Sequence, residues 1–119
     1  MQDFYDLLKN IKKRPTVYLG KYSIFSLQSF WDGYDFARRE LSLPLTAQET
    51  EFKEFLKWLR EKFKVETGQS WSSIILFHSA DERDALDRFF KLFDEFLSQN
   101  VNSNKADSLN LKQDLAVRK

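Results

Sequence analysis

The sequence LDRFFKLFDEFL, at residues 86–97, is the stretch that decides the fold. Its apolar residues recur every three or four positions, which is the spacing of one face of an α-helix. Most of them are phenylalanines, and each such ring buries about 150–250 Å² when it is covered. We therefore expect a long helix that runs to about Gln99 and forms one wall of an aromatic core. Its apolar face comprises Leu86, Phe89, Phe90, Phe93, Phe96 and Leu97.

The residues before this stretch indicate where the helix begins. Ser79-Ala80-Asp81-Glu82 has the spacing of a capping box, in which a hydroxyl and a carboxylate satisfy free backbone N–H groups. Residues 70–78 suit either a short buried helix or a short buried strand, because so few residues do not separate the two periods. We favour a helix, since one strand in a helical chain has no strand to pair with.

Two helices are predicted near the N-terminus. Residues 3–13 carry apolar side chains at helical spacing, and Pro15 ends that helix because a proline disfavours helical geometry in the residue before it. Residues 16–20 then form a short extended stretch or turn. Ser23 is a suitable N-cap for the second helix, which we expect to run to about Leu41.

The second helix and the one after it carry further signals. Gly33 lies inside the second helix, where glycine costs about 1 kcal/mol relative to alanine, and it indicates a close approach of another helix. Phe25 and Phe36 lie off the main apolar face, so this helix is expected to be covered on two sides. Thr46 and Glu49 have capping-box spacing and open a third helix over residues 48–63.

The composition favours one all-α domain without a covalent cross-link. The chain has 19 aromatic residues and no cysteine, so it offers no disulfide, no thiolate nucleophile and no cysteine-based zinc site. From residue 100 onward the aromatics stop and polar residues dominate, which is typical of a disordered tail. We expect a compact bundle of four to five helices with an aromatic core at residues 1–99, followed by a polar, disordered tail at residues 100–119.

The charge balance limits the classes of partner. The formal net charge is +1, whereas a dedicated nucleic-acid binder carries a strongly basic face. The longest apolar run, residues 74–77, is too short to cross a bilayer, and the N-terminal residues lack the apolar core of a signal peptide. We expect a cytoplasmic protein that binds no membrane and for which a nucleic-acid partner is disfavoured.

Few residues suggest catalysis. His78 is the only histidine, so no second one lies at metal-ligand spacing, and three glycines do not make a phosphate-binding loop. Asp84, Asp87 and Asp94 share a helix face, where carboxylates balanced by Arg and Lys are typical of a solvated surface. We therefore expect no enzyme activity, no metal and no cofactor.

The side chains most suited to binding a protein partner fall into three groups. A basic patch around the first turn comprises Lys9, Lys12, Lys13, Arg14 and Lys21, and we expect Arg38 and Arg39 to join it. An acidic face follows the last helix. Tyrosines and tryptophans are the third group, because these types, with arginine, are the usual anchors of interfaces. The partner-binding candidates are Arg14, Tyr18, Lys21, Tyr22, Arg38, Arg39, Trp58, Trp71, Asp84, Asp87 and Asp94.

A short stretch resembles part of an ATPase domain. The sequence IKKRPTVYLG, at residues 11–20, is similar to the Arg-Pro-Gly-Met-Tyr-Ile-Gly stretch of type II topoisomerase ATPase domains. Thr16 and Val17 replace the Gly-Met of that motif, and the ATP-binding motifs of the family have no counterpart in this chain. ATP binding is therefore not expected.

A wider pattern covers residues 1 to about 98. It comprises the Arg-Pro-x-x-Tyr-Leu-Gly turn at residues 14–20, WDGY at 31–34, FLKW at 55–58, Ser70-Trp71, and RFFKLFDEFL at 88–97. This pattern resembles small uncharacterised bacterial proteins of toxin–immunity loci of the contact-dependent inhibition kind. The resemblance implies a cytoplasmic protein that binds and blocks a cognate toxin domain without catalysis, and it assigns no functional residue.

Three functional hypotheses follow. The leading one is a non-catalytic protein-binding protein, an immunity protein that neutralises a toxin domain. The alternative is a helical module that associates with nucleic acid through the basic residues around Arg14. The third is a small enzyme that uses His78, which requires a cleft and a carboxylate hydrogen-bonded to the imidazole.

Overall fold

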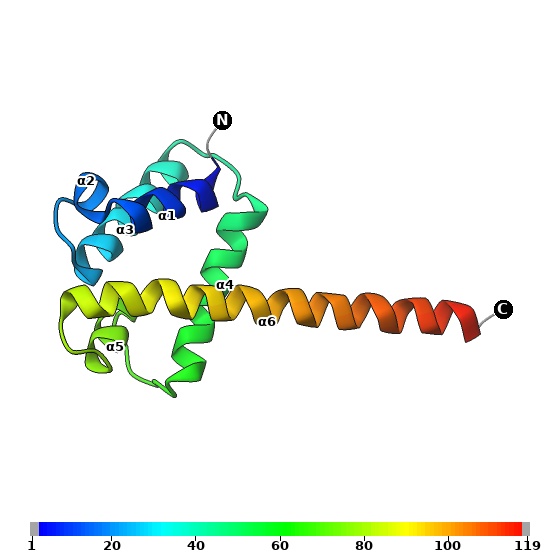
Figure 1. The fold of residues 1–119 in the computed structure, drawn as a ribbon. Helices are drawn as coiled ribbons and strands as arrows, with labels where there is room; N and C mark the ends of the chain where they lie inside the picture. Colours follow the sequence, from blue (N-terminus) through cyan, green and yellow to red (C-terminus); the bar gives the residue numbers. More distant parts are fainter. Residues whose placement is uncertain (1–2, 118–119) are drawn as a thin grey trace.

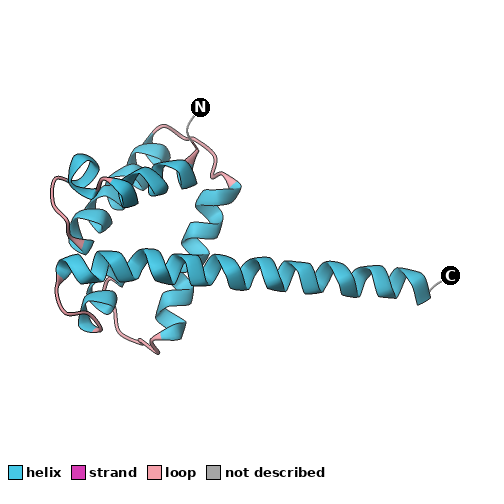
Figure 2. Ribbon diagram, viewed as in Figure 1, coloured by secondary structure: helices cyan, strands magenta, loops and turns pink. Residues whose placement is uncertain are grey.

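The computed structural model describes the backbone of residues 3–117 and the side chains of residues 3–100. Over the described backbone every regular element is a helix, which confirms the all-α fold class (Figure 2). The elements are α1 (Phe4–Lys13), α2 (Pro15–Leu19), α3 (Ile24–Glu40), α4 (Ala47–Lys62), α5 (Trp71–Phe77) and α6 (Glu82–Val117).

The first half of α6 is the axis around which the other helices are arranged. Figure 1 shows α1, α2 and α3 on one side of α6 and α5 on the other, with α4 crossing it. Helices α3, α4 and α5 all contact α6. The second half of α6 projects beyond the other helices, and the longest dimension of the molecule is 59 Å.

The core is a continuous cluster of aromatic rings contributed by five helices, α1, α3, α4, α5 and α6. Phe55 of α4 lies with its ring centroid 5.0 Å from that of Phe93 and 5.5 Å from that of Phe89, both on α6. Phe52 contacts Trp31 of α3 at 4.6 Å and Phe4 of α1 at 5.2 Å, the latter edge to face. Such tilted and edge-to-face pairs are the geometries that aromatic rings prefer, so the predicted aromatic core is confirmed.

Local sequence signals explain most helix starts. The Thr46 hydroxyl accepts a hydrogen bond from Glu49 N, and a Glu49 carboxylate oxygen accepts one from Thr46 N, so this predicted capping box is confirmed. Ser23 caps α3 as predicted. The ambiguous stretch at residues 70–78 forms the helix α5 with Ser70 as its N-cap, because Trp71, Ile74 and Ile75 form one buried face.

The start of α6 differs from the prediction by two residues. Asp81, not Ser79, is the cap: its carboxylate accepts a hydrogen bond from Asp84 N at 2.7 Å. The Asp84 carboxylate accepts a hydrogen bond at 2.9 Å from the backbone N of Ala80, the residue before the cap, so the bond does not come from the cap residue as it does in a capping box. Glu82 instead accepts a hydrogen bond from Ser23, which ties the beginning of α6 to the beginning of α3.

Other expectations about the backbone are also wrong. Residues 16–20, expected to be extended or a turn, largely belong to α2, because Pro15 is pre-organised for the first position of a helix and Gly20 ends it at a φ of 78°. A Cβ on Gly33 would meet nothing within 4 Å, so no helix approaches closely there. Phe25 and Phe36 are exposed, so α3 is covered on one side only.

The end of α6 is the last difference. The backbone remains helical to Val117, beyond the end expected near Gln99. Neither glycine nor proline occurs after Asn100, so the chain supplies no helix terminator there. The division into a domain at 1–99 and a tail at 100–119 stays a prediction, and the side chains of the tail beyond residue 100 lie outside the described part.

Candidate protein-binding surfaces

The turn between α1 and α2 presents cations and apolar groups together. None of the five residues of α2 is buried, and Val17 and Tyr18 are 70% and 38% exposed. Lys13, Arg14 and Tyr18, with Asn10, line an open hollow of about 290 Å³. Among residues 3–100, no carboxylate lies within ion-pair distance of Lys13 or Arg14. We call Lys13, Arg14, Val17 and Tyr18 the α2 surface.

Lys21 and Tyr22 follow the α2 surface along the chain. Lys21 is exposed, whereas Tyr22 is half-buried and joins the start of α3 to α6. The Tyr22 hydroxyl donates a hydrogen bond to Asp87, and the Arg83 guanidinium lies 4.2 Å from the centroid of the Tyr22 ring. The hydrogen bond to Asp87 raises the pKa of Tyr22, with a smaller contribution from burial. Tyr22 therefore serves the packing of α3 on α6.

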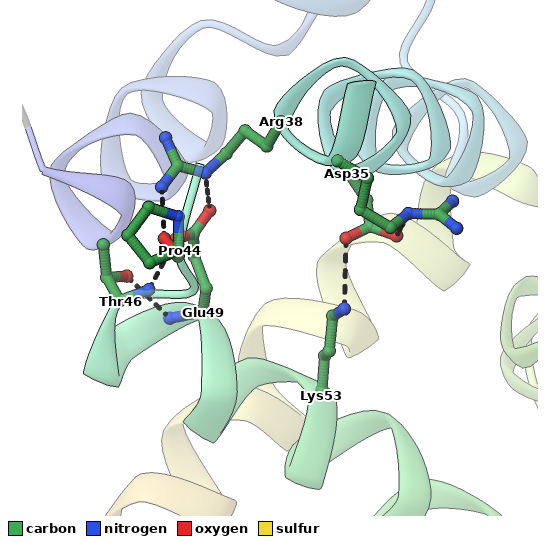
Figure 3. Close-up of polar contacts among 7 residues, drawn as sticks. Asp35, Arg38, Pro44, Thr46, Glu49 and Lys53 are labelled. Carbon is green, nitrogen blue, oxygen red and sulfur yellow. Dashed lines mark hydrogen bonds and ion pairs between the residues drawn. The ribbon is translucent and has the colours of Figure 1, made fainter. Parts of the chain in front are cut away.

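Arg38 lies apart from the α2 surface, at the connection between α3 and α4 (Figure 3). Its Nε lies 2.5 Å from a carboxylate oxygen of Glu49, and its terminal nitrogen donates to the carbonyl of Pro44 at 3.0 Å. The Glu49 side chain is 2% exposed and that of Arg38 is 24% exposed. Arg38 thus fastens the α3–α4 connection and is not part of the basic patch.

Arg39 also pairs with a carboxylate, which a lysine of α4 shares. Its Nε lies 3.3 Å from the carboxylate of Asp35, one turn earlier on α3. Lys53 of α4 approaches the other oxygen of Asp35 at 3.1 Å (Figure 3). The expectation that Arg38 and Arg39 join the cations around Arg14 is therefore not met, because both lie in the last turn of α3 and pair there with carboxylates.

The Glu49 carboxylate is ionised despite its burial. Burial raises its pKa, but hydrogen bonds from Thr46 and the Tyr34 hydroxyl, together with the charge of Arg38, outweigh that effect. The pKa of Glu49 therefore lies below its ordinary value. The pKa of Tyr34 is raised, mainly by burial and to a smaller extent by its hydrogen bond to Glu49. Glu49 thus completes the capping box of α4 and pairs with Arg38.

A large hollow lies beside this cluster, between the first turns of α1 and α4. Its volume is about 500 Å³, and its lining includes Asp3, Tyr34, Arg38 and Gln48. The polar groups in it already bond one another, because Gln48 donates to Asp3 at 3.2 Å and accepts from Tyr5 N at 2.9 Å. The hollow offers a ligand few free recognition groups.

The acidic candidates are separated and individually paired. Asp84 lies 3.1 Å from Arg88 Nε, Asp87 accepts from Tyr22, and Asp94 lies 3.8 Å from Lys12 Nζ. Ten residues of helix separate the first from the last, which is about 15 Å at 1.5 Å per residue. These carboxylates do not form one concentrated acidic site.

The two tryptophan candidates have different environments. Trp71 is 7% exposed and lies 5.4 Å from Phe89 between ring centroids, so it belongs to the core and not to a binding surface. Trp58 is half-buried: its ring stacks on Phe55 at 5.9 Å, and Lys62 Nζ lies 5.2 Å from its centroid. Trp58 remains a candidate at the edge of the core.

His78 lies in an exposed aromatic group at the end of α5. Its ring stacks on Phe63 at 4.6 Å and meets the edge of Phe77 at 5.2 Å. A hollow of about 160 Å³ beside it also includes Glu95, whose carboxylate pairs with Lys62 Nζ at 3.1 Å. Within residues 3–100 His78 has no hydrogen-bonded carboxylate, which the enzyme hypothesis requires.

Sequence reasoning missed Val17 and Phe77 as surface residues. Phe77 is 84% exposed although it ends the apolar run at residues 74–77. The signal lay in the helical period: Phe77 follows Ile75 by two residues, or about 200° around the helix, and so faces away from the core. We call Phe63, Phe77 and His78 the Phe77 patch.

The described residues offer neither a metal site nor a membrane span. Among the described residues, no group of three or more His, Cys, Asp or Glu side chains is arranged to hold a metal ion. None of the helices, over the part of the chain that is described, combines the length and the apolar character needed to cross a bilayer. Comparisons with protein-family models, curated proteins and solved structures found no match to this chain.

Proposed function

We propose that this protein is a non-catalytic binding protein that neutralises a bacterial toxin domain, and that it contacts the toxin through the α2 surface. The observation that carries the proposal is the exposure of α2, a helix with no buried residue that holds Val17 and Tyr18 beside Lys13 and Arg14. Apolar contact area next to arginine and tyrosine is the usual composition of an interface hot spot.

The charge of this surface defines the partner. Lys13 and Arg14 have no carboxylate within ion-pair distance among residues 3–100, so both remain available to an acidic group of another molecule. Complementary charge speeds association and fixes the register of a complex. The toxin domain is therefore expected to present an acidic face, unlike the basic nucleases that acidic immunity proteins bind.

The resemblance to proteins of toxin–immunity loci supports the same proposal. The Arg-Pro-x-x-Tyr-Leu-Gly turn, part of the pattern that carries it, is the segment that forms α2 and its flanks. The segment that carries the resemblance is thus exposed, as a binding surface must be.

The proposal is tested by deleting the gene in its native host while the neighbouring genes stay intact. We expect growth to stop, because a toxin encoded nearby is released from inhibition, and we expect the intact gene on a plasmid to restore growth. Normal growth of the deletion strain, with the neighbouring toxin gene expressed, would contradict the proposal.

Surface variants then locate the interface. Arg14→Glu combined with Tyr18→Ser should weaken binding of the purified toxin domain by about thirtyfold or more, the effect of a hot spot worth at least about 2 kcal/mol. Lys57→Glu is the matched control, because Lys57 is an exposed cation of α4 outside the α2 surface. Equal binding by both variants would remove the α2 surface from the interface.

The same cations support a second candidate, a module that associates with nucleic acid. Lys13, Arg14 and Lys21 lie close together in the chain, and three phosphate contacts predict a slope of about −3 in a plot of log affinity against log salt concentration. Fluorescence anisotropy with labelled DNA and RNA measures that slope. Undetectable or salt-independent binding would end this candidate.

A further inference from the structure

The Phe77 patch combines a protruding ring with an adjacent hollow. Phe77 is the most exposed of the large apolar side chains at residues 3–100. The hollow beside it, of about 160 Å³, is lined by Phe63, Ile75, His78 and Leu92, with charged side chains at its rim. Phe77 is in contact with His78, so the protruding ring and the hollow adjoin without overlapping.

The size of the hollow suits an aromatic ring. A cavity of about 150 Å³ with apolar walls holds one benzene molecule in other proteins. Four of the seven residues that line this hollow are apolar or aromatic, and a further ring can pack against the stacked pair of Phe63 and His78. The chain therefore carries both a ring to be buried and a recess of matching size.

We propose that the Phe77 patch binds a second copy of this chain in a two-fold symmetric dimer, with Phe77 of each copy in the hollow of the other. A two-fold interface uses the same surface on both copies, so that surface must complement itself. A ring beside a hollow of the same size meets that requirement.

The charges at the rim are also compatible with two copies. Lys91 and Glu95 lie one turn apart on α6, and both line the hollow. A two-fold axis between two antiparallel α6 segments brings Lys91 of one copy towards Glu95 of the other. The contact is small, so we expect a weak dimer in exchange with the monomer, as is usual for interfaces below about 1,200 Å².

Sedimentation equilibrium of the full chain, from about 10 µM to about 1 mM, tests the proposal. We expect the average mass to rise from monomer towards dimer over that range. Phe77→Ser should weaken dimerisation at least tenfold, whereas Phe36→Ser should not change it, because Phe36 is an exposed ring on α3 away from the patch. A monomer at every concentration, or equal loss in both variants, would overturn the dimer.

A mixing experiment separates ring-in-hollow contact from general stickiness. Leu92→Arg blocks the hollow and keeps Phe77, while Phe77→Ser keeps the hollow and lacks the ring. Each variant alone should be monomeric, but their mixture retains one intact ring–hollow contact and should form a measurable heterodimer. If Leu92→Arg does not fold, as judged by circular dichroism, the proposal is still decided by comparing the dimerisation of Phe77→Ser with that of Phe36→Ser.

The outcome is independent of the proposed toxin partner. If the chain is monomeric and Phe77→Ser abolishes protection in the deletion strain, the patch belongs to the toxin interface and the dimer is refuted. If Phe77→Ser abolishes dimerisation while protection is unchanged, the dimer stands and toxin binding lies elsewhere.

Discussion

Replacing Arg38 by alanine tests the tie between α3 and α4. The substitution removes the ion pair to Glu49 and the hydrogen bond to the Pro44 carbonyl, and it leaves a carboxylate that is 2% exposed without its cation. Breaking a buried pair by removing one partner costs about 3–5 kcal/mol. Because Thr46 still bonds Glu49, we expect the lower end of that range, about 3 kcal/mol.

The neighbouring arginine supplies the control. Arg39 also pairs with a carboxylate, but its side chain is 66% exposed, and exposed pairs contribute about 0–1 kcal/mol. Arg39→Ala should therefore lower stability by less than about 1 kcal/mol. The sequence does not distinguish these two adjacent arginines, so the difference between the variants measures the effect of tertiary position alone.

The pH dependence gives the prediction a second readout. The pKa of Glu49 lies below the model-peptide value of 4.5 in the folded protein, so its stabilisation is present above pH 4.5 and is lost as the pH falls through the folded value. Removing Arg38 raises that pKa, since burial is then opposed by the hydrogen bonds alone. Acidification therefore lowers the free energy of unfolding of the variant less than that of the unmutated protein. The difference in stability between the two proteins narrows below pH 4.5.

Urea unfolding followed by circular dichroism at pH 7 and at pH 3.5 measures both effects. At pH 7 the expected loss corresponds to a fall in melting temperature of about 10–15 °C for a domain of this size. A loss for Arg38→Ala below about 1 kcal/mol, or a deficit of equal size at the two pH values, would refute the argument that a buried, ionised Glu49 depends on Arg38.

Three further predictions concern stability and are measured by the same unfolding assay. Gly33→Ala should stabilise the protein by about 1 kcal/mol, because its Cβ enters open space on a helix. Gly20→Ala should instead destabilise it by about 1 kcal/mol, because φ is +78° there. The reverse order of stabilities would contradict the assigned backbone. Phe55→Ala should lower the free energy of unfolding by about 3–5 kcal/mol and Phe36→Ala by less than about 0.5 kcal/mol, because only the Phe55 ring is buried. Similar losses in the two variants would mean that the core is misassigned. Thr46→Ala should cost about 1 kcal/mol through loss of the cap of α4, and no loss would show that the capping box contributes nothing.

The sequence did not predict most of the side-chain pairs, and it predicted the candidate site only in part. Arg14, Tyr18 and Lys21 are exposed as expected, since they flank a proline and a glycine that interrupt the helices. Arg38 was grouped with them by charge, but its partner Glu49 lies 11 residues further along the chain, beyond a loop. Likewise, Tyr22 meets Asp87 across 65 residues, a contact that no local pattern contains.

By itself, the sequence determined α1, α3 and α4 and the caps Ser23 and Thr46, and it favoured a helix where α5 lies. Helical period and capping are local properties, because they depend on residues three or four positions apart, and both are written in the chain. Only the tertiary structure decided which apolar faces are covered: Trp71 packs on Phe89 of α6 and is buried, while Phe25 and Phe36, expected to be covered on a second side of α3, are exposed. The physical reason is that burial depends on which neighbouring helix docks against each face, and docking is set by the packing of the whole aromatic core.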